Sequence, residues 1–396
     1  MASMEMGLAP NAAADFSSGV VPLKELMARR VHLGIVRELT PPEGNIGLNF
    51  VPFMDVEADD VIMDYLRGTG SGLAPAVSPD AEAELFQDSD DVTGQIKASI
   101  MDWRLKSRYS ATDIHQYFEA KQVLEDAAKN GTTIPTTTLG SLTKKIDNKV
   151  ARDTVRRKQA LDNRIEWLIM KGLVDARIQY DDGKIKFDVD FKRPAGNVKV
   201  DGVGGVDLDY SSDTHDPINQ IIAQKQAAFD DHGVDLSRML VSRKFANSLF
   251  KSSKFMPRTG FAPSAGVDPK YVLEGWGPKA AIDIIQRECD VELIINDNVF
   301  RQRNPLTGVI QNVRYQPENE VLFLPNEAQI AAYDDTELGF GKILTSPHPM
   351  NDFNPGWYAW ETETTDPWVR FVGTGIKAFP VLPHMELTYK WTVDLG

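Results

Sequence analysis

The chain has a single cysteine, Cys289, among its 396 residues. This count rules out an intrachain disulfide and a cysteine-based metal cluster, and it fits a reducing compartment. Long hydrophobic runs are missing too. Without about 18 consecutive apolar residues, no transmembrane helix is expected. The opening residues MASMEMGLAPNAAADF lack the basic flank and the apolar stretch of a signal peptide, so none is expected.

Positive charge is comparatively scarce. The chain has 43 basic and 57 acidic residues, which gives a formal net charge of −14. General binders of nucleic acid or of anionic membranes are usually basic, so both functions are disfavoured for the outer surface, although a local basic patch is not excluded. With 42% hydrophobic and 25% charged residues the chain can bury real cores, and its length predicts two or three domains.

Signatures of catalysis and metal binding are absent as well. The histidines are His32, His115, His215, His232, His348 and His384. No His-x-x-x-His or His-Glu-x-x-His pair occurs among them, and the chain has no Gly-x-Ser-x-Gly nucleophile elbow. Cys289 lies beside an apolar run, where a cysteine is more often part of the core than a nucleophile. We therefore expect no catalytic residue, no metal site and no cofactor.

Two segments bear a partial likeness to ligand-binding loops. RGTGSG, from Arg67 to Gly72, suggests a phosphate loop, but it lacks the Gly-Lys-Ser/Thr ending and does not open a helix. DLDYSSD, residues 207–213, alternates acidic residues as a calcium loop does. It lacks the central glycine and the final glutamate of such a loop, so a solvated acidic loop is the better interpretation.

The most regular pattern lies at the C-terminus. In MELTYKWTVDL, from Met385 to Leu395, apolar and polar residues alternate without exception. A period of two predicts a β-strand with one buried and one exposed face. IKFDVDF, from Ile185 to Phe191, has the same pattern after an Asp182-Gly183 turn. We predict that the two strands share one sheet, with Trp391 buried against a long helix and Lys390 exposed.

Two helices are predicted before that turn. The first covers Ala111–Asn130 and ends at Gly131, a common helix stop. The second runs from a cap at Ser141 to about Val174, and at 1.5 Å per residue its roughly 33 residues span about 50 Å. Strict heptads are absent, which disfavours a coiled coil. Charges surround its middle, which predicts a helix that bridges packed parts of the protein.

The basic run of this helix consists of Lys149, Arg152, Arg156, Arg157 and Lys158. Three interpretations stay open. The run could meet phosphate, it could pair with acidic groups of a neighbouring subunit, or it could form an ordinary solvated helix face.

The segments before these two helices contain too few regularly spaced apolar residues to form a core of their own. Residues 1–45 predict an arm that either packs on its own subunit or is held by other chains, with one short helical stretch at Leu23–Arg30. IGLNFVPF (residues 46–53) alternates like a strand, and GQIKASIMDWRLKSRYS (residues 94–110) predicts a second extended segment. The Gly/Pro/Ser-rich stretch from Gly68 to Pro79 then predicts the tip of a long projecting hairpin.

Residues from about 195 to 345 predict an inserted α/β domain. Its clearest element is a helix at Pro217–His232, with Asp216 before it and Gly233 after it. The other predicted elements are the strand RMLVS, the helix KFANSLFKSS, the buried strands VELIIND and EVLFLPN, and a long hairpin at RQRNPLTGVIQN between those two strands.

The order of these parts resembles the major capsid protein of tailed phages, with the Hong Kong 97-type fold, and within it the lambda-type major capsid family. ARDTVRRKQALDNRIEWLIMKGLVDARIQYDDGKIKFDVDF is similar to that family's basic spine helix and hairpin. DTHDPINQIIAQKQAAFDDHGVDLSRMLVS, followed by KFANSLF, resembles the opening of its axial domain, and DPWVRFVGTGIKAFPVLPHMELTYKW its closing segment. The resemblance covers residues 45–396. DGVGGVDLDYSSD departs from it, because the family has an aromatic residue before the Asp-Pro helix.

The resemblance implies an α+β fold in four parts. These are an N-terminal arm (1–45), an extended loop (46–112), a peripheral domain with the spine helix and a sheet (113–194, completed by 346–396) and an axial α/β domain (195–345). The implied function is that of a major capsid protein without enzyme activity, which self-assembles into the icosahedral head shell enclosing phage DNA. The alternatives are an encapsulin-like nanocompartment shell and an α/β enzyme with an unrecognised site.

The resemblance also implies partners. They are further copies of the chain as hexamers and pentamers, a separate scaffold protein, a portal and a decoration protein, with no membrane. The shell would enclose double-stranded DNA without sequence-specific binding, and the acidic balance fits an interior that does not hold DNA tightly. The expected location is the virion capsid, after assembly in the host cytoplasm.

Overall fold

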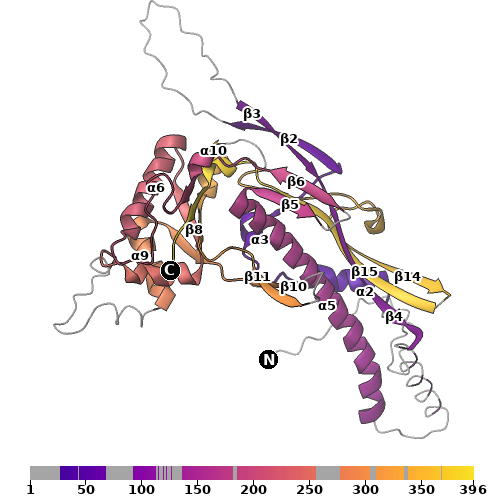
Figure 1. Cartoon of the computed structure of the whole chain (residues 1–396). Helices are drawn as coiled ribbons and strands as arrows, with labels where there is room; N and C mark the ends of the chain where they lie inside the picture. The colour runs from indigo at the N-terminus through magenta and orange to yellow at the C-terminus, as the bar shows by residue number, and fades with distance from the viewer. Residues whose placement is uncertain are drawn as a thin grey trace, which may run out of the picture. The chain divides into compact units, whose positions relative to one another are not determined.

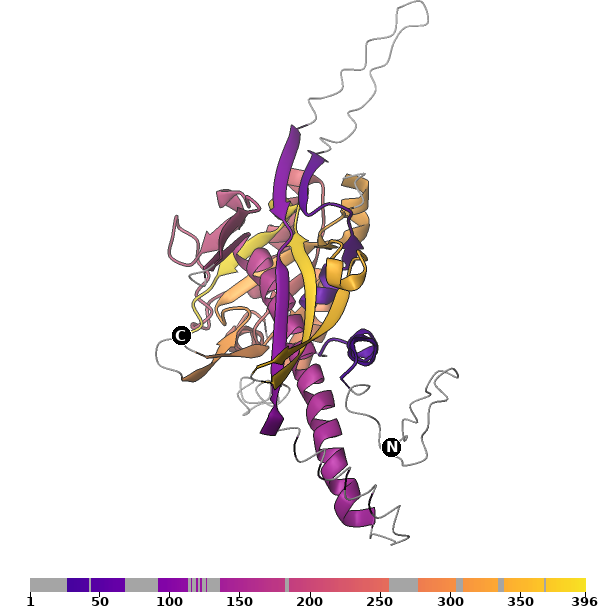
Figure 2. The same ribbon diagram turned by 90° about the vertical axis from the view of Figure 1, so that its right-hand side faces the viewer.

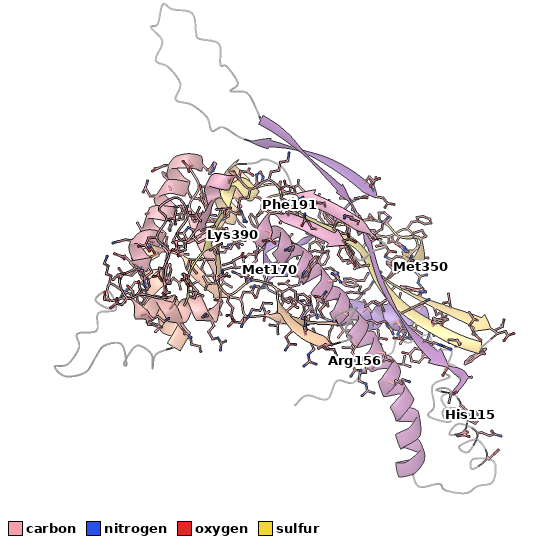
Figure 3. All side chains as sticks on the ribbon, viewed as in Figure 1. His115, Arg156, Met170, Phe191, Met350 and Lys390 are labelled. Carbon is pink, nitrogen blue, oxygen red and sulfur yellow. The ribbon has the colours of Figure 1, made fainter. Side chains whose placement is uncertain are left out.

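The computed structural model describes residues 27–42, 44–67, 92–112, 136–181, 185–255, 277–303, 309–333, 338–366 and 368–396, and the single residues 115, 119, 122 and 126. The chain divides into two compact units. Unit 1 consists of Met1–Pro42, Asp102–Asp162 and Pro347–Lys377, and unit 2 of Glu43–Met101, Asn163–Ser346 and Ala378–Gly396. Figures 1 and 2 show the ribbon in two views, and Figure 3 adds the side chains.

The main core of unit 2 forms around a five-stranded mixed sheet. Its strands are, in spatial order, β7 (Val198–Val200), β16 (Tyr389–Thr392), β12 (Glu320–Pro325), β8 (Leu236–Val241) and β9 (Glu292–Ile295). β16 runs parallel to β7 and antiparallel to β12, while β8 is antiparallel to β12 and parallel to β9. The helices of this part are α6 (Pro217–His232), α7 (Arg243–Ser248) and α9 (Gly277–Cys289).

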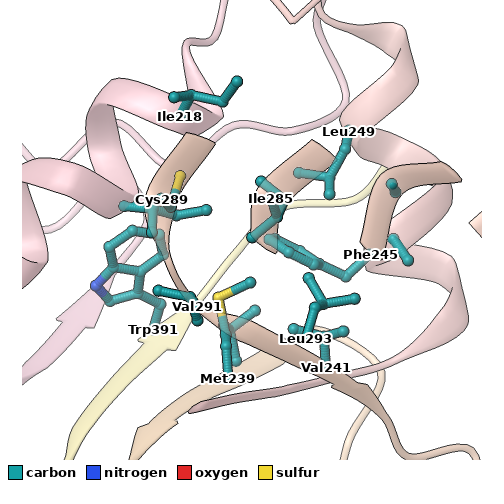
Figure 4. Close-up of a cluster of buried hydrophobic side chains, with 14 of the residues drawn as sticks. Ile218, Met239, Val241, Phe245, Leu249, Ile285, Cys289, Val291, Leu293 and Trp391 are labelled. Carbon is teal, nitrogen blue, oxygen red and sulfur yellow. The ribbon is translucent and has the colours of Figure 1, made fainter. Parts of the chain in front are cut away.

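Apolar side chains join these helices to the sheet. Ile218 of α6, Phe245 of α7 and Ile285 of α9 form one buried cluster with Met239 and Leu293 of the strands (Figure 4). β12 is buried at every position but its first, as the apolar run in its sequence predicts. The inserted α/β elements expected between residues 217 and 325 are therefore present.

α6 has the ends that its sequence predicts. Asp216 precedes the helix, and its carboxylate accepts a hydrogen bond from the backbone N–H of Asn219. Pro217 occupies the first turn, where a missing N–H costs nothing. Gly233 ends the helix with φ of 68°, in the left-handed region that glycine adopts without strain.

The predicted partner of the C-terminal strand is wrong. β16 pairs with β12 and β7, whereas β5 (Arg177–Asp181) and β6 (Lys186–Asp190) form a separate two-stranded hairpin. The predicted burial of Trp391 is correct, since this side chain is 1% exposed, but it packs in the core of the five-stranded sheet rather than against the long helix. Its ring meets Phe323 edge-on at 4.6 Å between centroids. The predicted strand is also too long, since Met385–Leu387 form a 3-10 turn in which Glu386 is buried. Alternation specifies the two faces of a strand, not its neighbours or its ends.

The remaining elements of unit 2 are short. They are α3 (Gly47–Phe50), β1 (Phe53–Asp55), β2 (Asp60–Arg67), β3 (Val92–Ser99), β10 (Val299–Arg303), β11 (Ile310–Arg314), α10 (Glu327–Tyr333), β13 (Lys342–Thr345) and the 3-10 turns η1 (Ala195–Asn197), η2 (Leu249–Lys251) and η5 (Met385–Leu387). β10 and β11 form the hairpin expected between the strands β9 and β12.

The predicted long hairpin is partly confirmed. β2 and β3 pair antiparallel from Asp60↔Ser99 to Arg67↔Val92, which makes both arms extended. The predicted tip, residues 68–79, lies outside the described residues. The predicted strand at residues 46–53 is wrong, because residues 47–50 form α3 and the extended chain begins only at Phe53.

Unit 1 contains an antiparallel sheet and the first part of the long helix. β4 (Asp102–Ser110) and β14 (Trp357–Thr365) pair with opposite edges of β15 (Trp368–Val381). α2 (Arg29–Glu38) contacts β14, and a 3-10 turn, η4, spans Pro349–Asn351. Gly373 and Gly375 of β15 lie under aromatic rings of β14. A Cβ atom on Gly373 would come within 2.2 Å of the Trp360 ring, so only glycine fits there.

The long helix, α5, is longer than predicted. It spans Thr136–Asp175, so it begins five residues before the expected cap at Ser141 and ends one residue after Val174. Most of the predicted helix Ala111–Asn130 lies outside the described residues. Among the described helices, none is both long and apolar enough to cross a membrane.

Candidate functional site

The residue types that could carry chemistry are dispersed. Cys289 is 4% exposed and belongs to the apolar cluster of unit 2. His215 packs on Tyr210 at 4.6 Å between ring centroids, and its Nδ1 lies 2.7 Å from the carbonyl of Ser212. Within the described part of the chain, no three His, Cys, Asp or Glu residues gather closely enough to hold a metal ion.

The acidic loop at residues 207–213 contains hydrogen bonds between its own residues. The Asp209 carboxylate accepts hydrogen bonds from the backbone N–H of Ser211, at 2.9 Å, and from its hydroxyl. These bonds hold the pKa of Asp209 below its usual value. The carboxylate is thus engaged with its own loop, as expected of an Asx turn. The phosphate-loop candidate falls almost wholly outside the described residues, which include only Arg67 of it.

The basic run of α5 divides between two faces of the helix. Arg157 and Lys158 are buried, at 5% and 3% exposure, whereas Arg152 and Arg156 are exposed and Lys149 is half-buried. In the sequence the five residues form one basic run. The helical period of 3.6 residues separates them, because residues 157 and 158 share the side of Val150 and Leu161.

Buried Arg157 joins three elements of unit 1. Its guanidinium donates to Thr154 of α5 at 2.9 Å, to Ser107 of β4 and to Thr374 of β15 at 3.4 Å. Thr154 donates in turn to the carbonyl of Val150. The guanidinium thus fixes the helix on the sheet through neutral oxygens.

The same network holds α2. The Nδ1 of His32 lies 2.9 Å from the Thr154 hydroxyl, and His32 is 1% exposed. Burial, with the nearby Arg157 charge, lowers the pKa of His32 to about 4, so the ring is neutral near pH 7. A neutral imidazole can therefore join α2 to α5 without bringing a second charge beside Arg157.

Lys158 and Asp162 form an ion pair one turn apart on the buried face of α5. Their side chains are 4% and 3% exposed, and the ammonium lies 3.8 Å from the centre of the Trp357 ring. Burial lowers the pKa of Lys158 and raises that of Asp162, while each charge partly offsets the effect on the other. This pair anchors α5 to β14, and a lysine at this position is not available to outside ligands.

In unit 2, Glu166 of α5 anchors the start of α3, which precedes the long hairpin in the chain. Its carboxylate accepts the backbone N–H of Gly47 at 2.8 Å, and the backbone N–H groups of Ile46 and Leu48 also favour its charged form. Gly47 permits this approach, since a Cβ there would lie 2.9 Å from the second carboxylate oxygen. This bond satisfies the free N–H of Gly47 at the start of α3, which favours a turn here over an extended chain.

The Glu166 carboxyl has an unusual acidity. The residue is 1% exposed, and burial raises its pKa to about 7, although three backbone N–H groups favour the charged form. No sequence motif predicts a role for Glu166. Its only mark in the sequence is an acidic residue amid the apolar stretch RIEWLIM, a pattern that does not name its partner.

Within the described residues, the buried polar side chains of α5 hold elements of the fold together. α5 carries a buried ionic anchor for the sheet of unit 1, a neutral anchor for α2, and a carboxyl anchor for α3 in unit 2. β2 and β3 pair with each other and, among the described strands, with no other strand. A lone two-stranded hairpin is marginal in water, so this one needs another surface to stabilise it.

Comparisons with known proteins identify a family and similar solved structures. Residues 56–256 match the sequence model of the family described as phage major capsid protein E. No curated protein matches the chain. Among solved structures, a protein assigned as a prophage capsid protein in E. coli CFT073 superposes with a TM-score of 0.54 at 13% identity, over 92% of this chain and 97% of that one.

Two further structures are similar at lower scores. A phage-related protein from Bordetella bronchiseptica RB50 has a TM-score of 0.46 at 14% identity, over 92% of this chain and 97% of that one. The SrpI encapsulin complex of Synechococcus elongatus PCC 7942 has a TM-score of 0.42 at 9% identity, over 91% and 90%. The similarity to the prophage protein confirms the Hong Kong 97-type fold expected from the sequence.

Proposed function

The chain belongs to the phage major capsid protein E family, and on that premise we propose that each copy in the head shell laps its long hairpin over a neighbouring copy. As a major capsid protein it forms the shell of a phage head, and its place is the virion capsid. The lapped hairpin is the finer part of the proposal. The observation that carries it is the β2–β3 pair, which has no other strand beside it in the described residues.

Exposed apolar side chains support further contacts between copies. On α6, Ile222 and Phe229 are 41% and 55% exposed and lie two helical turns apart on one face. On the β10–β11 hairpin, Val299 and Ile310 are 50% and 66% exposed. Apolar groups of this size left in water are stabilised when another subunit covers them.

The proposed domain division follows the family fold. It comprises an arm (1–45), an extended loop (46–112), a peripheral domain (113–194 with 346–396) and an axial domain (195–345). One amendment is needed, because β16 lies in the five-stranded sheet with β8, β9 and β12. We therefore assign Tyr389–Thr392 to the axial domain.

The proposed partners are double-stranded DNA inside the shell, a separate scaffold protein, a portal and a decoration protein, with assembly in the host cytoplasm. The net charge of −14 supports weak, non-specific contact with DNA, since like charges repel it. A nanocompartment shell of the same fold is the second candidate. An enzyme is a weaker one, since the described residues bring no catalytic group together.

Electron microscopy of the purified protein tests the proposed function. Alone or with its scaffold protein, it should form closed shells or capsomer rings. A protein that stays monomeric at high concentration with scaffold present would contradict the proposal. Shells that enclose host enzymes instead of DNA would favour the nanocompartment.

A further inference from the structure

α5 presents a compact basic surface in unit 1. Lys149, Arg152 and Arg156 are spaced by three and four residues, so they lie on one face of the helix, and they are called the basic stripe below. Arg152 and Arg156 are exposed, and Arg156 is labelled on α5 in Figure 3. No ion pair within the described residues engages either arginine. In a chain of net charge −14, two such arginines one helical turn apart call for an anionic partner.

The sequence of the long hairpin contains a matching pattern. Residues 80–90, DAEAELFQDSD, place an acidic residue at every even position except Phe86, and they are called the acidic segment below. This segment lies outside the described residues and leads into β3. In an extended chain, residues two apart share one side and are about 6.6 Å apart. The five carboxylates would therefore lie in one row.

The spacing of carboxylates along an extended acidic segment agrees with the spacing of the arginines along α5. Arg152 and Arg156 are four residues apart on a helix, which is about 6 Å along its axis. Successive carboxylates of an extended acidic segment can thus meet successive guanidinium groups, which bind carboxylates in a fixed fork geometry. We propose that the acidic segment of one copy docks along the basic stripe of a second copy. The proposal rests on the proposed function, in which copies lie side by side in a shell.

DNA phosphate is the competing partner for the basic stripe. Duplex DNA carries a charge about every 1.7 Å and would bind almost any set of cations. It gives no role to the alternation in the acidic segment, whereas a partner surface with regularly spaced cations does. The observations therefore favour a second copy of this chain.

Charge reversal tests the docking. The stripe variant is Arg152→Glu with Arg156→Glu, and the segment variant is Glu82→Lys with Glu84→Lys. Each alone should raise the subunit concentration at which shells form by about tenfold or more, because several exposed pairs per subunit become repulsive. The control, Arg152→Lys with Arg156→Lys, keeps the charge but loses the fork geometry, so it should assemble at a concentration much closer to that of the wild type than the stripe variant does.

Mixing the two variants shows where the contact lies. In an equimolar mixture, the unchanged segment of one variant meets the unchanged stripe of the other, so shells should form again at near wild-type concentration. A contact within one chain would not be rescued by mixing, and that result would overturn the proposal. All four changes in one chain should also restore assembly.

A second measurement needs no variant. Shells assembled from isotope-labelled and unlabelled copies are treated with a zero-length carbodiimide cross-linker. Mass spectrometry should then find Lys149 joined to a carboxylate of residues 80–90, with one label on each side. Cross-links only within one label, or none to the acidic segment, would overturn the docking.

The outcomes separate this proposal from the proposed function. A wild-type protein that forms no shells refutes the function, and the docking falls with it. Wild-type shells together with normal assembly of the stripe variant refute the docking alone. Stripe-variant shells that assemble normally but retain less DNA would identify DNA as the partner of the stripe instead.

Discussion

The Glu166 anchor makes the stability of the subunit depend on pH in a defined way. The pKa of Glu166 is about 7 in the folded protein, against 4.5 for an ordinary glutamate. A carboxyl whose folded pKa is raised contributes its full stability below about pH 4.5 and loses it as pH rises through 7. At about 1.4 kcal/mol per pKa unit, the loss is about 3 kcal/mol.

Glu166→Gln should remove this dependence. The amide has nearly the same shape, and its carbonyl oxygen can still accept the N–H of Gly47, but it does not titrate. The free energy of unfolding of unassembled subunits, measured by denaturant titration from pH 4.5 to 8, should therefore fall more steeply with pH in the wild type. The difference between the two proteins should change by about 3 kcal/mol across this range.

The comparison with the variant matters because His32 acts in the opposite direction. Its pKa falls from 6.5 to about 4 on folding, so its contribution is present above pH 6.5 and is lost as pH falls. The wild-type curve alone would mix the two effects. His32→Gln serves as the matched control, since it should remove the acid-side loss and leave the Glu166 effect in place. Parallel pH curves for the wild type and Glu166→Gln would refute the reasoning.

Three other predictions concern packing, charge and assembly. Trp391→Ala should cost roughly 3–5 kcal/mol of unfolding free energy, because it removes a buried aromatic side chain; a denaturant midpoint equal to that of the wild type would contradict its place in the core. Lys158→Met should cost about 3–5 kcal/mol in the same assay, since it leaves the buried Asp162 carboxylate without its partner. If adding Asp162→Leu restores none of that stability, the pair does not act as described. Removing residues 68–79 should leave cooperative unfolding intact and weaken shell formation in sedimentation; loss of the unfolding transition would place the tip in the subunit core.

Lys390→Ala is the control for Trp391→Ala, and the structure changes the loss of stability expected from it. On alternation alone, Lys390→Ala would cost no more than about 0.5 kcal/mol, as expected for an exposed residue. In the structure its side chain is 12% exposed, with Nζ 2.7 Å from Glu320 and 3.3 Å from Asp175. We therefore expect a loss of about 1–2 kcal/mol, because truncation leaves two carboxylates partly desolvated. The contrast with Trp391→Ala persists but is smaller.

The sequence alone determined those helices and strands whose ends and buried faces depend on residues nearby in the chain. α6 begins and ends where Asp216, Pro217 and Gly233 place its limits, because capping depends on side chains within a few positions. The burial of Trp391 and Val393 follows from a period of two that one face must satisfy. The order of such elements was enough to suggest the family, which the match over residues 56–256 confirms.

Tertiary structure decided which distant residues meet. The C-terminal strand could pair with any strand of suitable pattern, and only the fold brings β12 and β7 to its edges. The basic run of α5 is continuous in sequence, yet contact with β14 and β15 buries Arg157 and Lys158 and leaves Arg152 and Arg156 in water. Glu166 meets Gly47 across more than a hundred residues, and the cost of burying its charge exists only in that environment. Pairing partners, burial and acidity arise from contacts distant in sequence, which local periodicity does not encode.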